Sequence, residues 1–70
     1  MLETVYVALL EEGTDCWRPV QAERLSNSEF VLHGSVPEDE LWQFRPGDHV
    51  RCVSHTFSNG TQGLLAVEKA

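Results

Sequence analysis

Three side chains of types that bind metals or act in catalysis lie close together in the second half of the chain. His49, Cys52 and His55 are spaced three residues apart. Imidazole nitrogen and thiolate sulfur are zinc ligands, and a cysteine beside a histidine can also form a nucleophile and its base. In a β-strand, however, successive side chains point to opposite faces, so Cys52 points away from both histidines. We therefore expect no metal site, no bound cofactor and no nucleophile–base pair here.

Other patterns typical of enzymes are also missing or have simpler explanations. The sequence has no Gly-rich phosphate loop, no Gly-x-Ser-x-Gly segment and no His-Glu-x-x-His segment. The run Glu38-Asp39-Glu40 suits the first turn of a helix, where negative charge is favoured. We therefore predict no catalytic residues and a protein that is not an enzyme.

Length and charge restrict the partners further. The chain has 70 residues, which is one domain spanning 1–70, and a formal net charge of −6. The few Lys and Arg residues are scattered, which disfavours nucleic acid and anionic membranes as partners. Two cysteines are too few for a disulfide framework, and no signal peptide or membrane-spanning run is evident. These features predict a soluble cytoplasmic protein with reduced thiols.

Aromatic residues are the strongest candidates for a binding surface. Trp17, Tyr6, Trp42 and Phe57 can serve either as core or as a platform for a ligand. Aromatic side chains and arginine are typical anchors of protein interfaces, and Trp17 is followed directly by Arg18 and Pro19. The candidate binding residues are Trp17, Arg18, Trp42, His55, Phe57 and Leu64.

The stretch from Val50 to Lys69 predicts a β-hairpin. Asn59-Gly60 between two β-prone runs is the strongest short hairpin signal. A two-residue turn there places Arg51 opposite Glu68, Val53 opposite Ala66, and His55 opposite Leu64. One face then carries the five residues Val53, His55, Phe57, Leu64 and Ala66. An exposed cluster of this kind indicates an interface, whereas a bulge or a covering element would make part of it core.

Three further segments have strand character and one has helical character. Residues 4–10, which are β-branched, aromatic and apolar, and residues 16–25 and 30–34 are expected to be strands. Pro19 within the second of them belongs at an edge, a strand start or a bulge. Ser35-Val36-Pro37-Glu38 matches a capping box and predicts one or two turns of helix, closed by Pro46-Gly47. The predicted fold is all-β: a small five-stranded antiparallel barrel or curved sheet, OB-like or SH3-like, with one short helix between strands three and four.

Three segments carry a resemblance to a group of small bacterial proteins. They are Cys16–Ala22, Trp42–Cys52 and the closing Leu-Leu-Ala-Val-Glu-Lys. The group shares a Trp-Arg-Pro-Val segment and a Phe-x-Pro-Gly-x-x-Val segment, and it has no assigned function. The resemblance implies a bacterial cytoplasmic origin and transfers no site residues.

Two functions remain as hypotheses. The first is a non-enzymatic module that binds protein, either another copy of itself or a different chain, because the chain is small, aromatic and without catalytic motifs. The alternative is an OB-type binder of single-stranded nucleic acid, which stacks bases on aromatic rings but needs a positive groove. The acidic charge favours the first.

Overall fold

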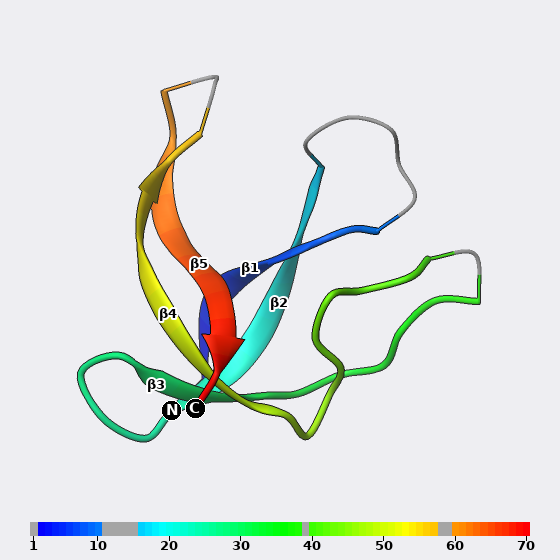
Figure 1. Cartoon of the computed structure of the whole chain (residues 1–70), viewed down its shortest axis with the longest axis horizontal. Helices are drawn as coiled ribbons and strands as arrows, with labels where there is room; N and C mark the ends of the chain where they lie inside the picture. The colour runs from blue at the N-terminus through cyan, green and yellow to red at the C-terminus, as the bar shows by residue number, and fades with distance from the viewer. Residues whose placement is uncertain (1, 11–15, 39, 58–59) are drawn as a thin grey trace.

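The computed structural model describes residues 2–10, 16–38, 40–57 and 60–70 and forms a closed barrel (Figure 1). Its strands are β1 (Leu2–Ala8), β2 (Trp17–Arg24), β3 (Glu29–Leu32), β4 (His49–Thr56) and β5 (Gln62–Lys69). The strands follow one another around the barrel in chain order. This order is a meander, and it differs from the Greek key of an OB-fold.

The barrel is closed by a parallel pair. Each strand pairs antiparallel with the next along the chain, but β1 and β5 run parallel where Tyr6 meets Leu65. Because strand direction alternates in a meander, the first and fifth strands must point the same way. The prediction of an all-β barrel is thus confirmed, and the prediction that it is antiparallel holds for every pair except the closing one.

Alternation of side chains along each strand builds the core. Every second residue points inward, and the interior fills with small and medium apolar side chains around Phe30, which has no exposed surface. The buried residues are Val5, Val7, Val20, Ala22, Phe30, Leu32, Trp42, Phe44, Val50, Cys52 and Ala66. Phe30 and Leu32 share the inner face, as the spacing predicts.

The predicted short helix between β3 and β4 is wrong, because the described residues contain no helix. In place of the helix, the Glu40 N–H donates to the Pro37 carbonyl in a turn. The chain then extends beside the end of β1, where Gln43 N–H donates to the Ala8 carbonyl. Extended backbone buries alternate residues, so Trp42 and Phe44 both enter the core while Leu41 stays exposed. Pairing with β1 outweighs the local capping signal.

The predicted register of the β4–β5 hairpin is right at its base and wrong beyond it. Arg51 lies opposite Glu68, but a bulge shifts the ladder by one residue, and Cys52 then faces Ala66. Phe57 N–H donates to the Thr61 carbonyl, so three residues separate the paired ends instead of two. Gly60 is described and has a φ of 87°, whereas the predicted turn residue Asn59 lies outside the described residues.

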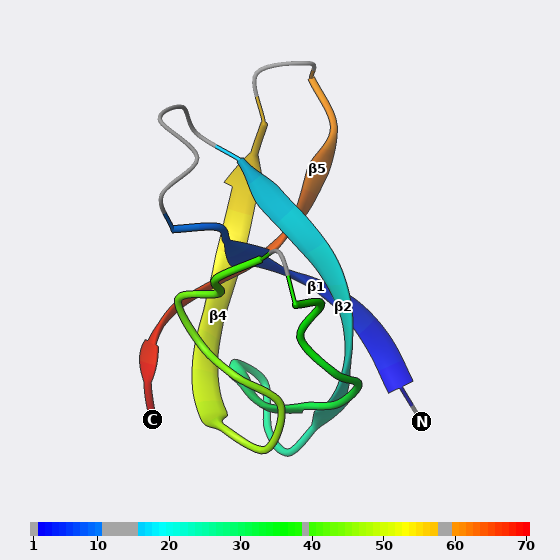
Figure 2. The same cartoon turned by 90° about the vertical axis from the view of Figure 1, so that its right-hand side faces the viewer.

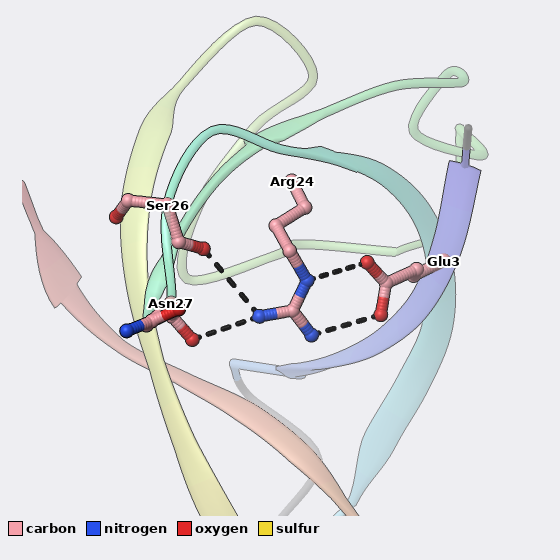
Figure 3. Close-up of polar contacts among 4 residues, drawn as sticks. All are labelled: Glu3, Arg24, Ser26 and Asn27. Atoms are coloured by element: carbon pink, nitrogen blue, oxygen red, sulfur yellow. Dashed lines mark hydrogen bonds and ion pairs between the residues drawn. The ribbon is translucent and has the colours of Figure 1, made fainter.

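An arginine joins the first strands at one end of the barrel (Figure 3). Arg24 donates to both carboxylate oxygens of Glu3, at 2.6 and 2.9 Å, and to the carbonyl of Asn27 at 2.8 Å. Its guanidinium also lies 4.7 Å from the ring centroid of Phe30. The hydrogen bonds to Arg24 lower the pKa of Glu3 and raise that of Arg24. The side chain thus ties β1 to the β2–β3 turn and lies beside the fully buried ring of Phe30.

Candidate functional site

Four aromatic rings, carried by β1, β2 and β4 with the residue just beyond it, meet on the outside of the barrel. Phe57, just beyond β4, is central: its ring centroid lies 4.7 Å from Tyr6, 4.9 Å from Trp17 and 4.7 Å from His55. Trp17 and His55 are 5.6 Å apart. Interplanar angles of 49 to 72° give tilted and edge-to-face packing, which is favourable for aromatic pairs.

The strand register shows that these rings belong to a wider apolar surface. Residues opposite each other in a ladder project from the same face. Reading across β2, β1, β5 and β4 gives one row of Pro19, Tyr6, Leu65 and Val53. On the same face, Trp17 lies opposite Ala8 across β2 and β1, and His55 lies opposite Gly63 across β4 and β5, with Phe57 beyond His55. We call these nine residues the outer patch.

Polar pairs bound the outer patch on both of its hairpins. On β1 and β2 the Gln21 side-chain amide donates to Thr4 Oγ1 at 3.0 Å, and on β4 and β5 Arg51 is hydrogen-bonded to Glu68 at 2.5 Å. Within the patch the only side chain that can carry charge near neutral pH is His55. An uncharged surface on a chain of net charge −6 is unusual and typical of a contact surface.

Small residues allow the rings to meet. Trp17 and His55 are on β2 and β4, which are separated by β1 and β5, and the residues opposite them in the ladders are Ala8 and Gly63. A Cβ atom at Gly63 would lie 2.8 Å from Tyr6 Cε1 and 3.3 Å from Phe57 Cε2. Any larger residue there would displace one of the two rings, so Gly63 is required for the packing of Tyr6 against Phe57.

The six predicted binding residues do not form a single site: three lie in the outer patch, one packs against the core, and two belong to a second group. Trp17, His55 and Phe57 lie together in the outer patch, as described above. Leu64 lies on the opposite face of β5 and packs against the core, because the bulge moves it and Ala66 inward. The prediction that one exposed face carries all five of Val53, His55, Phe57, Leu64 and Ala66 is therefore wrong for the last two.

Arg18 and Trp42 form a second group with a carboxylate between them. Glu40 accepts hydrogen bonds from Arg18 Nε at 3.0 Å and from Trp42 Nε1 at 2.9 Å, and a second oxygen pairs with Arg18 Nη2. Glu40 is only 12% exposed. This group fastens the segment before β4 to β2, and its polar atoms are used within the chain.

A shallow hollow of about 220 Å³ lies beside that group, along the edge of β2. It is lined by Arg18, Pro19, Val20, Gln21, His33, Gly34, Ser35, Pro37 and Trp42. Because β3 pairs only with Ala22 to Arg24, Pro19 lies on an edge where its missing N–H costs no ladder bond, as predicted.

The residues considered for catalysis or metal binding lie apart. Cys52 is buried, His55 is on the outer face, and His49 is 3.3 Å from the Glu29 carboxylate. Burial raises the pKa of the Cys52 thiol to about 11, which disfavours the reactive thiolate. Among the described residues no group of three or more His, Cys, Asp or Glu side chains could hold a metal ion.

Basic side chains are largely neutralised by carboxylates. Arg18, Arg24, Arg51 and Lys69 each lie within ion-pair distance of an acidic side chain. Those four are among only five Lys and Arg residues in the chain. None of the nine residues of the outer patch is Lys or Arg, so the patch itself provides no basic groove beside the rings.

Comparisons with known proteins give no match: no family model, no curated protein and no solved structure is similar to the chain. The part of the chain that the structure describes has no helix long and apolar enough to cross a membrane.

Sequence reasoning found three of the four clustered rings but did not place Tyr6 with them. The signal was present, since Tyr6 alternates with the inward-facing Val5 and Val7. What the sequence could not supply was the parallel pairing of β1 with β5, which brings Tyr6 beside Leu65 and Gly63. Without knowledge of that contact, the sequence does not indicate that Tyr6 packs against residues near the opposite end of the chain.

Proposed function

We propose that this protein is a non-enzymatic protein-binding module of the cytoplasm and that its contact surface is the outer patch. The observation that carries the proposal is the contact of Tyr6, Trp17, His55 and Phe57 on the outside of an already complete core. Half-buried aromatic rings of this kind supply much of the binding energy at protein interfaces. The pairing of basic side chains with carboxylates weighs against the nucleic-acid alternative.

The test compares retention of partners by the wild-type protein and by a patch variant. We expect the Trp17→Ala and Phe57→Ser double variant to stay folded but to lose the proteins that immobilised wild type retains, or to lose concentration-dependent dimer formation in sedimentation. Leu25→Ser is the matched control, because Leu25 is 49% exposed and lies outside the patch. If wild type stays monomeric and retains the same proteins as the double variant, the proposal fails.

A further inference from the structure

We propose that the outer patch binds a short extended segment of a partner that is rich in proline and carries basic residues. This inference rests on the protein-binding function proposed above and specifies the partner. Three properties of the patch lead to it: its size, the groups it offers, and the charge of the molecule.

Size argues for a short segment over a folded partner. A stable interface of ordinary size uses about 20 to 30 residues on each side. The outer patch has fewer than half as many residues. Its long direction crosses β2, β1, β5 and β4, which is three interstrand spacings or roughly 14 Å. A polyproline II segment rises ~3.1 Å per residue, so about five residues span the patch.

The available chemical groups favour binding across the strands. In the middle of the patch the backbones of β1, β5 and β4 pair with their neighbours, and only β2 from Trp17 to Val20 lies beyond the residues that pair with β3. Strand addition, a common way to bind extended peptides, could therefore reach only that edge of β2. A segment that contacts all of the rings lies across the strands.

Polar atoms of the rings complement a proline-rich chain. Trp17 offers an indole N–H, Tyr6 a hydroxyl and His55 an imidazole nitrogen. No hydrogen bond from these ring atoms occurs within the described residues. Proline-rich segments have exposed carbonyls, lack many N–H groups and are already extended, so they bind aromatic surfaces with little loss of entropy.

The negative net charge of the protein indicates that the bound segment carries basic residues. The chain carries a net charge of −6 and the patch adds no positive side chain near neutral pH other than a protonated His55. A field of this sign attracts cations and repels acidic segments. The faces of Trp, Tyr and Phe rings also attract Arg and Lys side chains. A segment that combines proline with arginine matches both properties.

The experiment measures fluorescence polarisation with three labelled nonapeptides: repeats of Pro-Pro-Arg, of Pro-Pro-Glu and of Gly-Gly-Arg. We expect the first to bind, and the other two to bind at least about tenfold more weakly, because each loses one of the two complementary properties. Trp17→Ala should weaken the first peptide by a similar factor, and Leu25→Ala should not. Salt should weaken binding of the first peptide only partly, because the ring contacts remain.

Equal binding of Gly-Gly-Arg, full binding by the Trp17→Ala variant, or no binding of Pro-Pro-Arg would each overturn this inference. Those outcomes can be distinguished from failure of the proposed protein-binding function. If the double patch variant still loses its retained proteins or its dimer while no proline peptide binds, the patch is an interface for a different class of partner. If neither assay responds to patch substitutions, both proposals are wrong.

Discussion

Cys52 shows how burial changes the chemistry of a single side chain. It is 3% exposed, and burial raises its thiol pKa from 9.0 to about 11. At mildly alkaline pH this lowers the thiolate fraction about a hundredfold. In a Cys16→Ser background we expect iodoacetamide to leave Cys52 unmodified in the folded protein and to label it in urea, as followed by mass spectrometry. Equal labelling rates in both states would contradict the buried position.

The pKa of Glu3, which pairs with Arg24, shifts in the opposite direction to that of Cys52. Hydrogen bonding to Arg24 lowers the pKa of Glu3 below its ordinary value of 4.5, so the charged carboxylate is favoured in the folded state. The pair thus contributes stability above that ordinary value, and the contribution is lost as pH falls through the lowered pKa of the folded state.

We expect Arg24→Gln to raise the pKa of Glu3 toward 4.5, as measured by a carboxyl NMR titration. The control is Arg51→Gln, which removes a different arginine–carboxylate pair. A Glu3 pKa that is unchanged by Arg24→Gln but shifts with Arg51→Gln would show that the assigned partner is wrong.

At the scale of elements, the bulge in the β4–β5 hairpin separates two residues that an unbroken ladder would place together. Leu64 packs against the core and Phe57 packs against the outer rings. We expect Leu64→Ser to lower the free energy of unfolding by about 2 kcal/mol in urea titration. Phe57→Ser should cost less and should change the near-ultraviolet circular dichroism of the rings. A larger loss for Phe57→Ser would place that ring in the core.

The elements also show where sequence reasoning ends. The β-strands could be predicted because side chains alternate between the two faces: Val20 and Ala22 are inward as expected, and Phe30 and Leu32 share one face as expected, which is the buried one. The bulge could not be predicted, because inserting one residue in a ladder leaves the local pattern plausible in either register. The helix was predicted from local signals, chiefly the capping box of Ser35 and Glu38 and the stop at Pro46-Gly47, and that local preference lost to backbone pairing of residues 41–43 with β1.

The residue types of the candidate site could be predicted from the sequence, but their positions in the fold could not. Aromatic residues could be selected as anchors, but whether a ring is core or surface depends on long-range pairing. Trp42 enters the interior through its bridge to Leu9, while Trp17 stays outside above Ala8. Both are tryptophans in similarly apolar surroundings, so composition alone could not distinguish them.

For the whole molecule, two phenylalanines provide a matched comparison of core and surface. A domain of this size has a total stability of about 4 to 10 kcal/mol. Phe30 is completely buried, and truncating such a ring to alanine costs about 3 to 5 kcal/mol. We expect Phe30→Ala to lose a large share of that stability and to melt far below Phe57→Ala, as shown by thermal denaturation. Similar melting temperatures would contradict the division between core and outer patch.

The shape of the molecule in Figures 1 and 2 also bears on how it assembles. Every antiparallel pair joins strands that are neighbours in sequence, so those contacts can form early, as each hairpin becomes available. The parallel contact of Tyr6 with Leu65 spans nearly the whole chain and has to wait for β5.

Before β5 arrives, β1 and β4 are both open edges, and such edges pair readily with other chains. During synthesis on the ribosome the growing chain therefore passes through an open sheet, and the arrival of its fifth strand pairs both open edges and converts an aggregation-prone intermediate into a closed barrel.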